Sequence, residues 1–321
     1  MLYVTNFFMK LYKTPIMVDH EVNAMRSIYR TYNTDIIFPR MDLDEFAWLF
    51  SNRDVEKTAG GKEEIDWASY QPEDIIRIPN RADLESSYSV QVLKAAREDK
   101  PLQDTLLGAF CPTPYSLVTG IIGLQAASTL LIRNRDFLSA LVATAANAIV
   151  EYIQVLKEVA GVIVLLAPSE CTISRKMYDK SVAAPVQQLV EAVAAGDNTV
   201  SFLHFCTRAN EHLLNAEVIT PLAKAGLMGL NVPNVMHAIP LARDLDLVLL
   251  GGIDPIGIQQ RPWQEIVQET KVLLEEIKDK GTRFVLGTDC NLTKIPLIEA
   301  SGTLLTKFLE LKKLVKEFSS A

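Results

Sequence analysis

Short apolar runs rich in β-branched residues recur along the chain, and polar or turn residues end each of them. Runs of this kind predict strands that are covered on both faces. Eight are present, at residues 15–19, 35–39, 105–111, 161–168, 200–206, 228–232, 247–254 and 283–290. Helical patterns lie between most of them, and the clearest are at 134–159, 176–195 and 262–280.

Strands that alternate with helices predict parallel pairing through right-handed crossovers. Eight such units within 321 residues favour an α/β fold of the (β/α)8 TIM-barrel type over an open sheet. A barrel also accommodates residues 1–321 as a single domain. Residues 41–100 interrupt the alternation, and we expect a lid-like excursion there, between strands two and three. A surface loop without that role is the alternative.

Composition and charge exclude several classes of protein. Hydrophobic residues make up 49% of the chain and charged residues 22%, which is typical of a globular protein and excludes disorder and coiled coil for the whole chain. The net charge is −7, and there is no cluster of five or more Lys and Arg residues. A protein that binds a phosphate backbone needs a basic face, so nucleic acid is not expected as a partner.

The sequence also predicts the compartment. The N-terminus lacks the pattern of a signal peptide, and the longest uncharged stretch, 106–132, is interrupted by Pro112, Pro114 and Gly120. We therefore expect a cytoplasmic protein with no membrane association. In a reducing compartment, its four cysteines are interpreted as core residues or metal ligands rather than disulfide partners.

Three soft ligands follow predicted strands. His204 and Cys206 form an H-x-C pair on the fifth strand, and Cys290 ends the eighth. Residues two apart on a strand share a face, and the active site of a barrel lies at the carboxyl ends of its strands. One imidazole and two thiolates suit Zn²⁺ with an open fourth position. Three buried residues at unrelated strand ends are the alternative, which spacing alone does not exclude.

Other polar residues also follow the predicted strands. Glu170 is a tentative fourth zinc ligand or proton-handling group, and a solvated carboxylate or helix cap is the alternative. Candidates for substrate binding are His20, Tyr115, Asn231 and Asp254. Each has a structural alternative, and for Asp254, which precedes a proline, a turn role is favoured. Cys111 and Cys171 are interpreted as core cysteines.

Four segments carry a resemblance to a known family. They are FCPTPYSLVTG (110–120), PSECTISRKMYDKSVAAPV (168–186), GGIDPIGIQQRPWQEIVQETKVLL (251–274) and FVLGTDCNLTKIPL (284–297). The chain resembles the uroporphyrinogen decarboxylase-like superfamily, and within it the zinc-dependent, corrinoid-linked methyltransferases. The resemblance implies a (β/α)8 barrel and a zinc site at His204, Cys206 and Cys290.

The chain departs from that superfamily at two motifs. The decarboxylases place an arginine-rich MRQAGR motif after the first strand, whereas residues 17–26 read MVDHEVNAMR. A porphyrinogen carries several carboxylates and needs arginines to bind them, so uroporphyrinogen is not the expected substrate. The thiol-methylating enzymes usually continue H-x-C-G, whereas this chain reads HFCTRANE from His204. A coenzyme M-type thiol substrate is therefore not favoured.

The resemblance implies transfer of a methyl group between a small molecule and a corrinoid carried by a partner protein. In the favoured version, an aromatic methyl ether donates its methyl group to Co(I), and zinc acts as a Lewis acid on the ether oxygen. In the alternative version, zinc binds a substrate thiol that accepts a methyl group from methylcobalamin. Uroporphyrinogen decarboxylation is a third alternative, and a protein that binds metal or corrinoid without turnover is a fourth.

Overall fold

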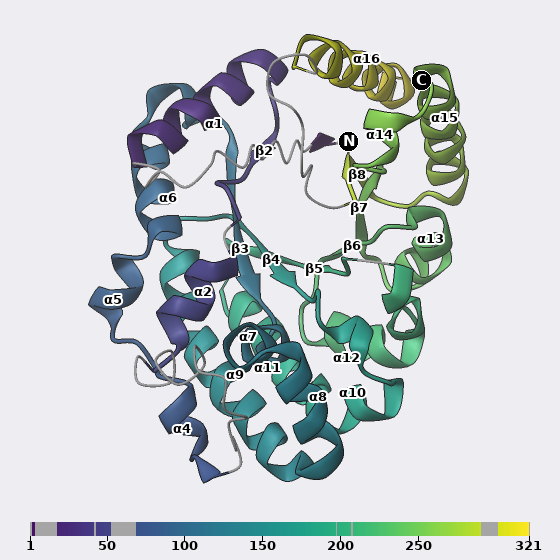
Figure 1. The fold of residues 1–321 in the computed structure, drawn as a ribbon. Coiled ribbons are helices and arrows are strands. Elements are labelled where there is room, and N and C mark those ends of the chain that lie inside the picture. Colours follow the sequence, from purple (N-terminus) through teal and green to yellow (C-terminus); the bar gives the residue numbers. More distant parts are fainter. Residues whose placement is uncertain are drawn as a thin grey trace.

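The computed structural model describes residues 2–3, 18–41, 43–52, 69–196, 198–206, 208–289 and 301–320. Its strands are β1 (Leu2–Tyr3), β2 (Ile36–Ile37), β3 (Leu106–Pro112), β4 (Val162–Leu166), β5 (Val200–His204), β6 (Gly229–Asn231), β7 (Val248–Ile253) and β8 (Phe284–Thr288). All the pairings between these strands are parallel, in the order β1-β8-β7-β6-β5-β4-β3-β2. The sheet curls, and the helices lie around its outside (Figure 1).

This α/β architecture agrees with the predicted alternation of strands and helices. Seven of the eight predicted runs contain an observed strand, from β2 to β8. β1 and β2 stand at the two ends of the strand order, and no pairing joins them among the residues described. The described part of the chain is therefore a curled parallel sheet consistent with a TIM barrel.

The prediction of a first strand at 15–19 is wrong for the part of it that the structure describes. Val18 and Asp19 begin helix α1 (Val18–Tyr32), and residues 15–17 lie outside the described residues. Val22 and Met25 are buried on one face of this helix, a spacing that suits a helix and not a strand. β8 pairs with β7 on one side and with β1 on the other, and β1 lies more than ten residues before the predicted run.

The helices before β4 are α2 (Leu43–Phe50), α4 (Pro72–Ile75), α5 (Arg81–Glu85), α6 (Tyr88–Glu98), α7 (Pro114–Ile122), α8 (Leu124–Arg133) and α9 (Arg135–Lys157), with the 3₁₀ helix η2 (Lys100–Leu102). The predicted excursion at 41–100 is helical where it is described. α2 packs on α7, α4 and α5 pack on α9, and α6 lies along α1. One antiparallel bridge, Ser51 with Ile76, is present among the described residues of this segment. Its role as a lid stays a prediction.

The helices after β4 are α10 (Arg175–Ser181), α11 (Ala183–Ala194), α12 (Ala216–Lys224), α13 (Val235–Asp244), α14 (Gly257–Gln260), α15 (Trp263–Lys280) and α16 (Ser301–Ser320), with the 3₁₀ helices η3 (Glu170–Thr172) and η4 (Arg208–Leu213). The predicted helices at 134–159 and 262–280 correspond to α9 and α15. The predicted helix at 176–195 is two helices that meet at Val182. Pro185 lies in the first turn of α11, where the missing N–H of proline is tolerated.

The sheet separates two hydrophobic clusters because successive side chains on a strand point to opposite faces. The larger cluster fills the space between the sheet and the helices. The smaller one lies inside the curl and contains Ile36, Phe38, Phe110, Val162, Val164, Leu166, Phe202, Leu250 and Val285. On β5, Phe202 belongs to the inner cluster and Leu203 to the outer one. His204 therefore faces inward, above Phe202.

Among the described residues, α9 is long and apolar enough to cross a membrane, and 56% of its apolar 18-residue window is buried inside the protein. α7 and α8 reach that length only as a pair, and they are bent by 111°. Tyr152 of α9 is fully buried and meets the rings of Phe46 and Phe50 edge-on, each at 5.9 Å between ring centroids. α9 also packs on α11 and α7. These contacts identify α9 as a core helix of the fold.

Candidate functional site

His204 lies at the carboxyl end of β5, on the inner face of the sheet. It stands in register with Leu166 of β4 and Asn231 of β6, and its carbonyl accepts a hydrogen bond of 3.0 Å from the Ala167 amide. The side chain is 5% exposed, and its Nδ1 atom has no hydrogen-bond partner among the described residues. A buried polar atom without a partner is costly, so this nitrogen marks a place where a ligand or metal would be stabilised.

Cys206 follows two residues later and is half-buried. It is a thiol and not part of a disulfide, as are Cys111 and Cys171. Cys290, the third predicted zinc ligand, lies outside the described residues. Within the described ranges, no three His, Cys, Asp or Glu side chains come together as a metal site. The imidazole and thiol that the structure does describe fit zinc by their chemistry, and they lie at the end of β5 and just after it.

Asp289 immediately precedes Cys290 and is buried at the end of β8. Its Oδ1 atom accepts a hydrogen bond of 2.5 Å from the Gly252 amide of β7. Gly252 has φ +93°, a left-handed conformation that L side chains rarely adopt. The ends of β7 and β8 are thus held together beside the position of Cys290 in the sequence.

Glu170 is fully buried in η3, just after β4. Its Oε1 atom accepts a short hydrogen bond from Thr113 Oγ1, and its Oε2 atom accepts one of 2.7 Å from Ser116 Oγ. Burial raises the pKa of this carboxyl to about 7, although both hydroxyl donors act in the opposite direction. Both oxygens are bound to hydroxyls of the segment after β3, and the tentative role of Glu170 as a zinc ligand stays a prediction.

Sequence reasoning did not identify the hydroxyl cluster around Glu170. Ser116 Oγ accepts a hydrogen bond of 3.3 Å from the Ser169 amide. Thr119 Oγ1 donates to the Ser116 carbonyl at 2.9 Å and lies 2.6 Å from Ser169 Oγ. Thr113, Ser116 and Thr119 are three residues apart, a spacing that places side chains on one face of a helix. That spacing is the signal that could have revealed the cluster.

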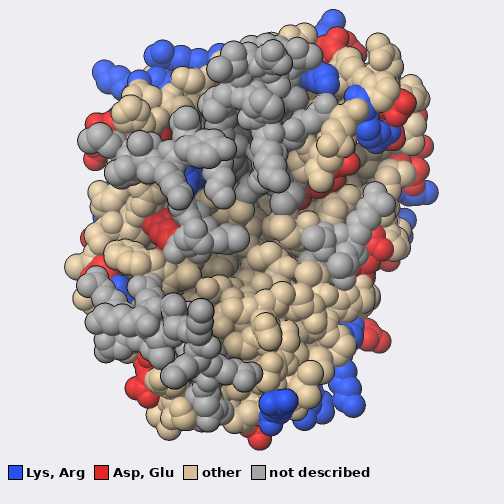
Figure 2. All heavy atoms as spheres, viewed as in Figure 1, with Lys and Arg blue, Asp and Glu red and all other residues tan. Residues whose placement is uncertain are grey.

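A pocket of about 250 Å³ adjoins the hydroxyl cluster at the carboxyl ends of β3 and β4. Its lining residues are Phe46, Ala47, Pro112, Ser116, Leu117, Thr119, Gly120, Leu124, Pro168 and Ser169. None of them is charged. The surrounding face is also poor in charge, since uncharged side chains cover most of the area over α7 and α8 (Figure 2).

The remaining predicted residues have different positions. His20 is exposed in the first turn of α1, and the two residues before it, which belong to the predicted first strand, are also helical. Asn231 is buried, and its Nδ2 atom donates to the Leu250 carbonyl at 2.9 Å. Asp254 accepts a 2.9 Å hydrogen bond from the Ile256 amide, which is the turn role favoured by the sequence. Tyr115 is fully buried in α7, and burial raises the pKa of its hydroxyl.

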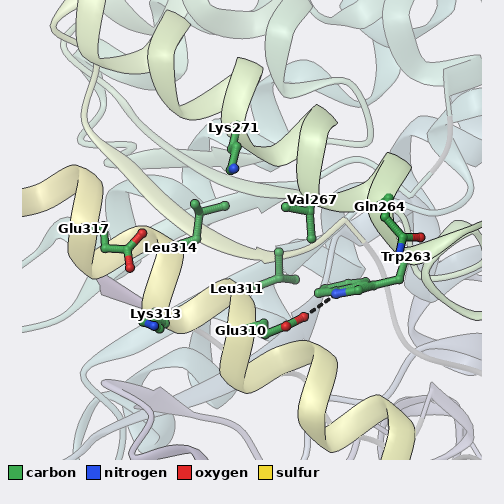
Figure 3. A pocket seen from close by; sticks show the side chains of 9 residues that line it. All are labelled: Trp263, Gln264, Val267, Lys271, Glu310, Leu311, Lys313, Leu314 and Glu317. Carbon is green, nitrogen blue, oxygen red and sulfur yellow. Dashed lines mark hydrogen bonds between the residues drawn. The ribbon is translucent and has the colours of Figure 1, made fainter.

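A second groove, of about 450 Å³, lies between α15 and α16 (Figure 3). Trp263 Nε1 donates a short hydrogen bond to Glu310 across it, and the Lys307 ammonium lies 5.7 Å from the centroid of the Trp263 ring. Lys271, Lys313 and Glu317 also line the groove, and none of the predicted site residues does. The groove belongs to the packing of α16 against α15.

Comparisons with known proteins agree with this architecture. A methyltransferase from Methanosarcina mazei superposes with a TM-score of 0.68 at 15% identity, over 93% of this chain and 86% of that one. A B12-independent methionine synthase from Shewanella sp. W3-18-1 superposes with a TM-score of 0.50 at 15% identity, over 71% and 68%. At this identity the two structures show a shared fold.

No curated protein matches the sequence. The family model for uroporphyrinogen decarboxylase (URO-D) matches residues 11–299, which is most of the chain. This protein therefore belongs to the uroporphyrinogen decarboxylase (URO-D) family.

Proposed function

We propose that this protein is a zinc-dependent methyltransferase that moves a methyl group from an aromatic methyl ether to the Co(I) of a corrinoid protein. The observation that carries the proposal is the buried Nδ1 atom of His204, which has no hydrogen-bond partner among the described residues. Cys206 follows two residues after the end of β5. An imidazole and a thiolate so placed suit one zinc ion, which would satisfy the unpartnered nitrogen.

His204, Cys206 and Cys290 would hold the metal. When bound, zinc supplies Lewis-acid stabilisation to the oxygen that leaves the methyl group. The residues below the site give it a low dielectric environment, because Leu166, Phe202 and Leu250 are buried inside the curl of the sheet. Electrostatic stabilisation is stronger in such surroundings than in water.

The family and the fold support methyl transfer, since the solved structure from Methanosarcina mazei is that of a methyltransferase. The charge of the site supports a neutral substrate. No charged residue lines the pocket at the ends of β3 and β4, and residues 17–26 lack the arginine-rich motif of the decarboxylases. A substrate with several carboxylates requires arginines directed at it, whereas a methyl ether does not.

Metal analysis tests the zinc site. The purified protein should contain about one zinc per chain. His204→Ala, Cys206→Ala and Cys290→Ala should each lose most of it and keep the circular dichroism of the parent, because residues at the strand ends do not support the core. Cys171→Ala is the matched control, since this half-buried thiol bonds the Pro168 carbonyl at 3.2 Å. Full zinc content in Cys290→Ala would exclude the proposed ligand set.

Spectroscopy of the cobalt centre tests the direction of transfer. A methoxyphenol added to the protein and a reduced Co(I) corrinoid protein should convert Co(I) to methyl-Co(III). A methyl ether is inert to ordinary protein nucleophiles, so the reaction should not proceed without the Co(I) acceptor. Loss of a methyl-Co(III) signal on addition of a small thiol, with methoxyphenols inactive, would reassign the protein as a thiol methyltransferase.

A further inference from the structure

We infer that the pocket at the ends of β3 and β4 binds the aromatic ring and hydroxyl of a neutral phenol, with Ser169 Oγ accepting the phenolic hydrogen. This inference rests on the proposed function and names the substrate class that the site takes. The pocket is lined by Phe46, Leu117, Leu124 and six further uncharged residues in addition to Ser169. A volume of about 250 Å³ suits a single-ring molecule, since it lies below the range of drug-sized sites.

The hydrogen bonds of the hydroxyl cluster determine what the pocket offers. Ser116 Oγ donates its hydrogen to Glu170 Oε2 at 2.7 Å. Thr119 Oγ1 donates its hydrogen to the Ser116 carbonyl at 2.9 Å. Either oxygen of the 2.6 Å contact between Thr119 and Ser169 could donate by geometry alone. Because a hydroxyl has one hydrogen and that of Thr119 is directed at the Ser116 carbonyl, we assign Ser169 Oγ as the donor.

Each of these three hydroxyl hydrogens is therefore directed at a protein acceptor, and Ser169 Oγ keeps its lone pairs for a ligand. Ser169 is also half-buried, which leaves it accessible from the pocket. A ligand that satisfies it must supply an O–H or N–H donor. An anionic group would place its charge against acceptor oxygens in an apolar pocket, which is unfavourable.

One wall residue of the pocket lies two strands away from the proposed metal site. Pro112 of its wall is in register with Leu166, which is in register with His204. Neighbouring strands are about 4.8 Å apart, so Pro112 and His204 are separated by about 10 Å across the sheet.

Calorimetry with two matched probes tests the inference. 2-Methoxyphenol and 1,2-dimethoxybenzene differ in that a methyl group replaces the phenolic hydrogen, and both are neutral at pH 8. We expect 2-methoxyphenol to bind about tenfold more tightly, the upper range for one neutral hydrogen bond. Equal affinity for the two compounds would overturn the inference.

Variants locate the binding site. Ser169→Ala should remove the preference for 2-methoxyphenol, whereas Thr129→Ala should keep it, because that exposed threonine bonds the Gln125 carbonyl outside the pocket. Gly120→Leu should abolish binding of both probes by filling the pocket. A Cβ atom at Gly120 meets only Ala47 Cβ, at 4.0 Å, so the larger side chain enters without a backbone clash. Unchanged binding in Gly120→Leu would place the ligand elsewhere and refute the inference.

The same measurement in His204→Ala separates this inference from the proposed function. The protein alone is titrated, with no corrinoid protein and no methyl transfer. Binding that is retained in His204→Ala and lost in Gly120→Leu supports the pocket even where methyl transfer is not observed. Binding that is lost in His204→Ala and retained in Gly120→Leu places the phenol at the metal site and contradicts the inference.

Discussion

Glu170→Gln removes a carboxyl group that is fully buried and replaces it with a side chain that cannot ionise. Burial raises the pKa of Glu170 from its ordinary 4.5 to about 7 in the folded protein. A carboxyl with a raised folded pKa stabilises the protein below its unfolded pKa, and that contribution is lost as the pH rises through the folded pKa. The parent protein should therefore lose stability relative to Glu170→Gln between about pH 4.5 and pH 7.

The size of this loss follows from the two pKa values. Linkage with 4.5 unfolded and about 7 folded gives a relative loss of about 2.5 kcal/mol between pH 5 and pH 8. Urea unfolding measures this loss. Between pH 5 and pH 8, the difference between the midpoint urea concentrations of the parent and of Glu170→Gln should change by about 1 M. A chelator in every sample removes the effect of bound metal, and Glu151→Gln on the exposed side of α9 is the matched control.

Two other results would indicate different environments for Glu170. If the difference in unfolding free energy between parent and variant does not change with pH, the carboxyl is solvated. A parent that gains stability relative to the variant at high pH would show a lowered pKa, as for a carboxylate paired with a cation. Either result would refute the reasoning from burial.

Three further substitutions test the packing, each by the midpoint of urea unfolding. Gly229→Ala should destabilise the protein by about 1–3 kcal/mol, because its Cβ atom would lie 2.5 Å from the Val248 carbonyl oxygen; an unchanged midpoint would contradict this close packing. Trp263→Phe should cost about 1–2 kcal/mol through the lost hydrogen bond to Glu310 and a weaker cation–π contact with Lys307, and no loss would show that α16 is held by other contacts. Lys157→Met should cost about 1 kcal/mol, because the ammonium binds carbonyls at the end of α11; a more stable variant would refute that role.

The sequence was sufficient for the strands that are long and apolar. β3, β4, β7 and β8 each contain at least five residues, enough for an apolar run to be recognised between turns. Of β1 the structure describes Leu2 and Tyr3, and in the sequence no turn residue separates them from the apolar positions that follow, whereas Asp35 and Pro39 bound the run that contains β2. The run at 15–19 resembled a strand because Ile16 and Val18 are β-branched, whereas the burial of Val22 and Met25 shows the helical period of the residues that follow.

One part of the candidate site was also predictable from the sequence, and another part was not. The two-residue period of a strand was enough to place His204 on an inner face together with Phe202. The surroundings of Glu170 depend on Thr113 and Ser116, which are 57 and 54 positions away in the chain. A contact over such a separation is created by the pairing of β3 with β4, and no local pattern reports it. The hydroxyl cluster and the pocket beside it therefore required the structure.

The pairing of β1 with β8 has a consequence for the synthesis of the protein. Leu2 pairs with Val285, so β1 is synthesised long before β8, the strand with which it pairs. At about 5–20 residues per second, the ribosome needs roughly 15 to 60 s to make the intervening chain. During that time the backbone of β1 lacks its partner, and an unpaired strand is a template for association with other chains.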